Sequence, residues 1–163
     1  MKEKGFSVIE LSAGIAIIMT ISAMAVSPIL SAIESYRLSA ASSAISATLY
    51  RARSEAITRN ANRDVFFSLA DNSFGIDAND DGALDTSEKM ALPRGVYLSL
   101  PGGTATPCAI RFNSRGEVPI IAPSFVLTGS PSVQVANSRD AQQVTVSLRG
   151  SVSVTAASLT SAH

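Results

Sequence analysis

One apolar stretch near the N-terminus limits what this chain can fold into. From Phe6 to Leu30 the only charged side chain is that of Glu10. As an α-helix this stretch would be about 37 Å long, which exceeds the roughly 30 Å of hydrocarbon in a bilayer. We therefore expect a helix that can cross a membrane. A carboxylate in hydrocarbon costs roughly 2.5–3.5 kcal/mol, so Glu10 is expected to have a partner or a function.

The residues before the apolar run narrow its interpretation. Lys2 and Lys4 precede a Gly5-Phe6 junction, and Glu10 follows four residues later. This arrangement resembles the class III signal of type IV prepilins, in which prepilin peptidase cuts after the glycine and the phenylalanine becomes an N-methylated first residue. The resemblance implies cleavage between Gly5 and Phe6. It also implies an assembly role for Glu10, whose carboxylate would meet the N-terminal amine of a neighbouring subunit.

Two other interpretations of the apolar run stay open. A secretory signal peptide would be cut after the small residues Ala23-Met24-Ala25, which would leave Val26 as the first residue. Against it, the run is too long and contains Glu10. An ordinary single-span anchor fits the length of the run but gives Glu10 no role.

Length and composition limit how many domains and which kinds of site the remainder of the chain can form. Of 163 residues, about 130 lie beyond the apolar run, which suffices for one domain. Lys+Arg and Asp+Glu balance at 13 each, so no net charge attracts nucleic acid. Cys108 and His163 are the only cysteine and histidine, which excludes an intrachain disulfide and histidine-based catalytic or metal sites. We predict that the protein is not an enzyme and requires no cofactor.

Helical periodicity continues beyond the apolar run and then changes to period two. Six apolar residues recur at spacings of three and four, as on one face of a helix: Leu38, Ala41, Ile45, Leu49, Ala52 and Ala56. Strands are predicted at 65–69, 73–76, 96–100, 109–112, 124–127, 133–136, 144–148 and 152–155. The turn formers Asp71-Asn72 separate the first two strands, and Arg149-Gly150-Ser151 separates the last two.

These patterns predict an α+β fold in which a long N-terminal helix packs on a mostly antiparallel β domain. The leader would comprise residues 1–5 and the transmembrane or filament-core helix residues 6–30. An amphipathic helix would follow over 31–60, and a β-rich globular domain over 61–163.

The helix end, residues 52–60, directly precedes a strand and resembles that of the FimT/GspH-type minor pilins and pseudopilins. Members linked to DNA uptake carry a C-terminal Gly-Arg-x-Arg motif. This chain has Leu148-Arg149-Gly150-Ser151 there, with one arginine. The resemblance therefore favours a structural minor pilin of a type IV pilus over a DNA-binding one. A type II secretion pseudopilin of the GspH type stays an alternative.

The same resemblance implies partners and a location. Other pilins or pseudopilins would bind through the N-terminal helix, and prepilin peptidase would process it. The chain would span the inner membrane once with its globular domain in the periplasm, and would enter a pilus or pseudopilus after processing.

One acidic segment matches the twelve-residue calcium loop at every oxygen position. The predicted Ca²⁺ ligands are Asp77, Asn79, Asp81, the carbonyl of Ala83, Asp85 and Glu88. Gly82 stands where that loop needs positive φ, and Leu84 supplies its apolar residue. The flanking sequence does not predict the two helices of an EF-hand, so a solvated hairpin loop rich in turn formers remains the alternative.

Overall fold

The computed structural model describes residues 7–100, 108–119, 126–127 and 129–158, without the side chains of 24–27. The chain forms two compact units, residues 1–35 and 36–163, and helix α1 (Val8–Arg59) contributes to both. The helix begins where the N–H groups of Glu10 and Leu11 both donate to the Ser7 carbonyl at 3.1 Å.

Helix α1 ends at a left-handed residue, close to the predicted boundary. Asn60 has a φ of 49°, and the N–H of Ala61 donates to the carbonyl of Ala56 at 3.1 Å. This geometry closes a helix C-terminus because it satisfies a carbonyl that has no partner within the helix. The predicted amphipathic face is confirmed, since its six apolar residues are all at most 2% exposed.

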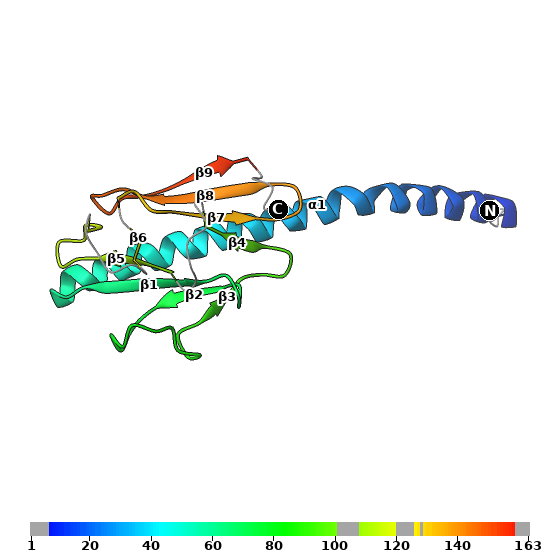
Figure 1. Ribbon diagram of the computed structural model, residues 1–163. Helices are drawn as coiled ribbons and strands as arrows, with labels where there is room; N and C mark the ends of the chain where they lie inside the picture. Colours follow the sequence, from blue (N-terminus) through cyan, green and yellow to red (C-terminus); the bar gives the residue numbers. More distant parts are fainter. Residues whose placement is uncertain (1–6, 101–107, 120–125, 128, 159–163) are drawn as a thin grey trace, which may run out of the picture. The chain divides into compact units, whose positions relative to one another are not determined.

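Two sheets make up the rest of the second unit (Figure 1). Sheet A has the order β3-β2-β1-β5-β6, with β1 at Arg63–Ser68, β2 at Ser73–Ile76, β3 at Met90–Ala91, β5 at Cys108–Phe112 and β6 at Val126–Leu127. Sheet B has the order β4-β7-β8-β9, with β4 at Tyr97–Ser99, β7 at Ser132–Ala136, β8 at Ala141–Val146 and β9 at Val152–Ala157. Only the β5–β6 pair is parallel.

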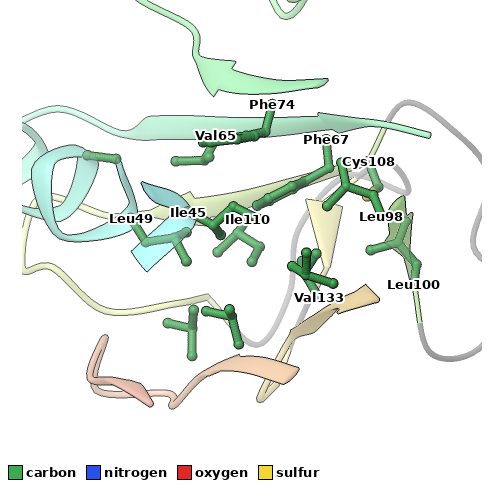
Figure 2. Packing of buried hydrophobic residues seen from close by; sticks show 14 of the residues in the cluster. Ile45, Leu49, Val65, Phe67, Phe74, Leu98, Leu100, Cys108, Ile110 and Val133 are labelled. Atoms are coloured by element: carbon green, nitrogen blue, oxygen red, sulfur yellow. The ribbon is translucent and has the colours of Figure 1, made fainter. Parts of the chain in front are cut away.

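One hydrophobic core joins both sheets to the second half of α1. Figure 2 shows Ile45 and Leu49 of the helix beside Ile110 of β5, with Val133 of β7 nearby. Strand alternation places Val65 and Phe67 of β1 in this core, while the intervening Phe66 belongs to a small second cluster. The predicted α+β fold, a long helix on mostly antiparallel strands, is confirmed.

The strand predictions differ from the structure in detail. Strand β3 was not predicted, because two residues carry too little pattern. Strand β8 begins at Ala141, before the predicted start, since Gln142 and Gln143 interrupt the apolar pattern. Strand β9 continues to Ala157, two residues beyond the prediction. The first two residues of the predicted 124–127 strand lie outside the described residues.

Candidate functional site

The apolar side chains in the first half of α1 are not buried by other described residues of the same unit. By length and composition the helix can cross a membrane, and none of its most apolar window is buried. Large apolar side chains are exposed all around it: Val8, Ile9, Leu11, Ile15, Ile17, Ile18, Met19, Ile21, Ile29 and Leu30. The hydroxyls of Ser12 and Thr20 donate to carbonyls four residues earlier, at 2.9 and 2.8 Å. Both hydroxyls are therefore satisfied inside the helix, as hydrocarbon surroundings require.

Glu10 lies in the first turn of α1 and is exposed. A carboxylate at this end is favoured by the helix dipole, whose positive end is the N-terminus. Gly5 and Phe6, where cleavage and methylation were predicted, lie outside the described residues. The contact between Glu10 and a neighbour's N-terminal amine therefore stays a prediction.

The predicted calcium loop, residues 77–88, lies against the face of sheet A that points away from the main core. Leu84 packs on the small cluster of Phe66, Ala109 and Val126. The loop also crosses Gly75 of β2, where an added Cβ would lie 2.2 Å from the Glu88 carbonyl oxygen. Gly75 is therefore needed for close approach, and the loop is anchored to the sheet at two points.

Inside the loop, the carboxylates of Asp77, Asp81 and Glu88 accept backbone N–H groups. Asp77 is 2% exposed, and its two oxygens accept from Asp80 at 2.7 Å and from Gly82 at 2.9 Å. Gly82 has a φ of 79°, as the loop pattern predicted. Glu88 accepts the N–H of Ala78 at 2.9 Å and thereby closes the loop.

The predicted calcium ligands only partly converge. The side-chain amide nitrogen of Asn79 donates to Asp81 at 3.0 Å and to Asp85 at 3.3 Å. This NH₂ group thus occupies the place between two carboxylates that a cation would take. Within the described residues, no three His, Cys, Asp or Glu side chains are grouped closely enough to hold a metal ion. Calcium binding stays a prediction, and it requires rotation of the Asn79 amide.

Beside this loop lies a charged pair that the sequence did not single out. Arg111 donates to both carboxylate oxygens of Asp64, at 2.7 and 2.6 Å, across the β1–β5 register. Hydrogen bonding to Asp64 raises the pKa of the Arg111 guanidinium above its ordinary value. A cavity of about 310 Å³ adjoins the pair, lined by Ala61, Asn62, Asp64, Asp77, Asp80, Gly82 and Arg111. A charge in the middle of a strand pattern was the only signal in the sequence.

A second feature missed by sequence reasoning is a pair of adjacent basic turns. One carries Arg115 and Gly116, and the other carries Arg149 and Gly150. Arg53 of α1 donates to the carbonyls of Gly116 and Arg149, both at 3.0 Å. An added Cβ at Gly150 would lie 2.0 Å from the Gly116 oxygen, so the two turns touch. The exposed Arg115 therefore lies on the turn adjacent to that of Arg149.

Comparisons with known proteins agree with this architecture. The family described as type II transport protein GspH matches residues 41–160. The chain belongs to the GspH family. A comparison with curated proteins finds no match.

Two solved structures share the fold of this GspH-family chain. The minor pseudopilin EpsH from the type 2 secretion system of Vibrio cholerae has a TM-score of 0.54 and 16% identity, over 74% of this chain and 97% of that one. The type IV minor pilin FimU of Pseudomonas aeruginosa has a TM-score of 0.56 and 16% identity, over 76% and 95%. The predicted relationship is confirmed: the chain is pilin-like, a structural subunit of a pilus or pseudopilus.

Proposed function

We propose that this protein is a minor subunit that enters its filament through the first half of α1. Burial of that helix among like helices would drive assembly, with Glu10 neutralised by the N-terminal amine of a neighbouring subunit. The supporting observation is an apolar helix, uncovered within its own unit, that exposes one carboxylate in its first turn. An unpaired charge in the filament core would be strongly destabilising, and a neighbouring amine would prevent that.

Processing and location belong to the same proposal. Prepilin peptidase would cut between Gly5 and Phe6, and methylation would follow on Phe6. Before assembly the helix would cross the inner membrane, with residues 36–163 in the periplasm. N-terminal sequencing and intact mass of membrane-extracted protein test this step. A chain that begins at methylated Phe6 supports it, whereas one that begins at Val26 would show ordinary secretion.

The assembly step is tested by Glu10→Ala. The variant should still be cleaved, because the peptidase acts on the leader junction, but filaments sheared from cells should lack it. Ser12→Ala is the matched control, since it lies in the same exposed region and keeps the charge unchanged. Normal incorporation of Glu10→Ala would contradict the proposed amine contact.

The filament type is a separate question. We favour a type IV pilus, and a type II secretion pseudopilus is the alternative. Deleting the gene and measuring surface pili alongside secretion of exported enzymes distinguishes them. Loss of pili with normal secretion supports the pilus, and the reverse result supports the pseudopilus.

The touching basic turns favour one second candidate function, DNA capture. Arg53 binds the two turns that carry Arg115 and Arg149, and none of the three has a salt bridge within the described part of the chain. Such a cluster can contact successive phosphates. Duplex DNA should then be retained by the detergent-extracted chain in low salt, and Arg115→Gln with Arg149→Gln should abolish retention. Arg94→Gln, an exposed arginine outside this cluster, is the control.

A further inference from the structure

Sheet B ends in strand β9, whose outer edge is open over its central residues within the described part of the chain. Of the four edge strands, β3 and β6 have two residues each and β4 has three. The edge of β4 is also covered, because the Asn72 side chain binds the N–H of Leu98 and the carbonyl of Val96. Strand β9 is six residues long and pairs with β8 over its whole length. It is the one long edge in the described structure.

The hydrogen-bond alternation shows which groups of β9 face outward. The N–H of Ser147 donates to the Ser151 carbonyl at 2.9 Å, so residues 151, 153, 155 and 157 bind β8. Val152, Val154 and Ala156 therefore direct their backbone groups away from the sheet. The outward direction of the Val152 carbonyl is supported by the Tyr50 hydroxyl, which donates to it at 3.0 Å.

Side chains occupy both ends of this edge. Tyr50 holds the Val152 carbonyl, and the Gln134 amide donates to the Ser158 carbonyl at 2.9 Å. Between these ends, the N–H and C=O groups of Val154 and Ala156 have no partner within the described residues. The open edge thus consists of two donors and two acceptors.

Between its two covered ends, β9 lacks the usual protection of an edge strand. Such strands carry charged residues, prolines or bulges that prevent pairing with another chain. Residues 150–158 contain no charged residue and no proline, and the β8–β9 register runs without a bulge. Val154 is also 45% exposed, although its cross-strand neighbour Val144 is fully buried. Both the backbone and one apolar side chain are therefore available to a partner strand.

We infer that β9 pairs antiparallel with β9 of a second copy of this chain, about a two-fold axis at Thr155. In this register Val154 faces Ala156 of the other copy, and each pair exchanges two hydrogen bonds. All four free groups of each copy are then satisfied. A register centred on Val154 would instead need the Val152 carbonyl that Tyr50 already binds. The uncharged strand has no like charges to repel its own copy.

The two-fold symmetry of this contact indicates whether it forms before or after filament assembly. A two-fold contact closes after two copies and cannot repeat along a helical filament. We therefore assign the pair to the unassembled chain. The inference rests on β9 alone and does not depend on the role proposed for Glu10.

Disulfide trapping of the full-length chain in native membranes tests the register. Two copies of Thr155 would form a non-hydrogen-bonded pair with Cα atoms about 4.5 Å apart, within the range that a disulfide bridges. Thr155→Cys should give a disulfide-linked dimer under mild oxidation. Ser153→Cys, on the same face of the same strand, is the matched control and should stay monomeric, because it would face residue 157 of the other copy.

A second variant connects the dimer to the backbone edge. Val154→Pro, added to Thr155→Cys, removes an outward N–H that β8 does not use, and should abolish the dimer. Circular dichroism checks that the sheet is retained, and Val154→Lys replaces the proline variant if it is not. The inference is overturned by a monomeric Thr155→Cys, by equal cross-linking of Ser153→Cys, by a dimer that survives the edge variants, or by cross-linking to a protein of different mass.

Discussion

The side-chain amide of Asn72 binds the backbone around Leu98 as a neighbouring strand would. Its Oδ1 accepts the Leu98 N–H at 2.9 Å, and its Nδ2 donates to the Val96 carbonyl at 2.6 Å. Asn72 lies in the β1–β2 turn with a φ of 48°, a left-handed conformation that asparagine tolerates better than most residues. One turn residue of sheet A thus closes the edge of β4 in sheet B.

Replacing Asn72 should therefore destabilise the domain in two separable steps. Asn72→Gly keeps the backbone conformation accessible but leaves two partly buried backbone groups without partners, at about 1–3 kcal/mol. Asn72→Ala should add roughly 1–2 kcal/mol, because alanine is strained at positive φ. Urea unfolding of the detergent-solubilised chain measures both, with the exposed Asn62→Ala as control. Equal stability of the glycine variant and the native chain would refute the bridging role.

The Asp64–Arg111 pair should show strong coupling. Asp64 is buried, whereas the Arg111 side chain is 23% exposed. Arg111→Met leaves a buried carboxylate without its partner and should destabilise the chain by about 3 kcal/mol. Asp64→Leu leaves a guanidinium that reaches solvent, so its cost should be smaller. The double variant should be less destabilised than the sum of the two by about 1–3 kcal/mol. Additive effects in the double-mutant cycle would show that the two side chains act independently.

The helix could be predicted from sequence because its signals are local. The apolar run needs only composition, and the stripe from Leu38 to Ala56 needs only a period of 3.6 residues. All six stripe residues are buried, and the helix ends within one residue of the predicted boundary. The turn at Asp71-Asn72 and the hairpin at Arg149-Gly150-Ser151 also carry their own backbone preferences.

Features that depend on distant residues could not be predicted. Asp64 and Arg111 are 47 positions apart, and only the β1–β5 register brings them together. Arg115 and Arg149 become neighbours because Arg53 binds both of their turns. For the acidic loop, the spacing of oxygen ligands was readable, whereas the orientation of the Asn79 amide was not.

Cys108 should react slowly while the chain is folded. Burial raises the pKa of its thiol from 9.0 to about 11, which disfavours the reactive thiolate. At pH 8 the alkylation rate should be roughly 100-fold lower in the native chain than in urea, from two pKa units of difference. An exposed thiol in Ser153→Cys, which lies away from the two-fold axis, provides the accessible reference. Equal rates for the two cysteines in the folded chain would contradict burial of Cys108.

The same shift has a consequence for stability. Above pH 9 the unfolded thiol ionises while the folded thiol stays protonated, so the unfolded state is favoured as pH rises. The contribution of Cys108 is therefore fully present below pH 9 and is lost as pH approaches 11. Cys108→Ser should flatten this part of the stability curve in urea unfolding between pH 8 and 11. An unchanged slope would assign the alkaline loss to other groups.

Calcium bound by the four predicted carboxylates should have a low affinity for the acidic loop. Arg63 donates to Asp80 at 2.8 Å, which places a positive charge beside the loop and opposes a divalent cation. We therefore expect a dissociation constant on the order of 10⁻⁴–10⁻³ M, as in extracellular calcium modules. Calorimetric titration of the full chain in detergent measures it.

Two neighbouring aspartates separate ligand binding from charge alone. Asp81→Asn removes a predicted ligand and should abolish the calcium heat. Asp80→Asn removes the same charge at a position that the loop pattern does not use, so the loss should be smaller. Some loss is expected, because the variant also leaves the Arg63 charge without its salt bridge. Equal losses in both variants would show that calcium responds only to the local negative charge. The absence of a calcium heat in the native chain would leave the loop as a turn held by its own hydrogen bonds, with Asn79 permanently in the place of the cation.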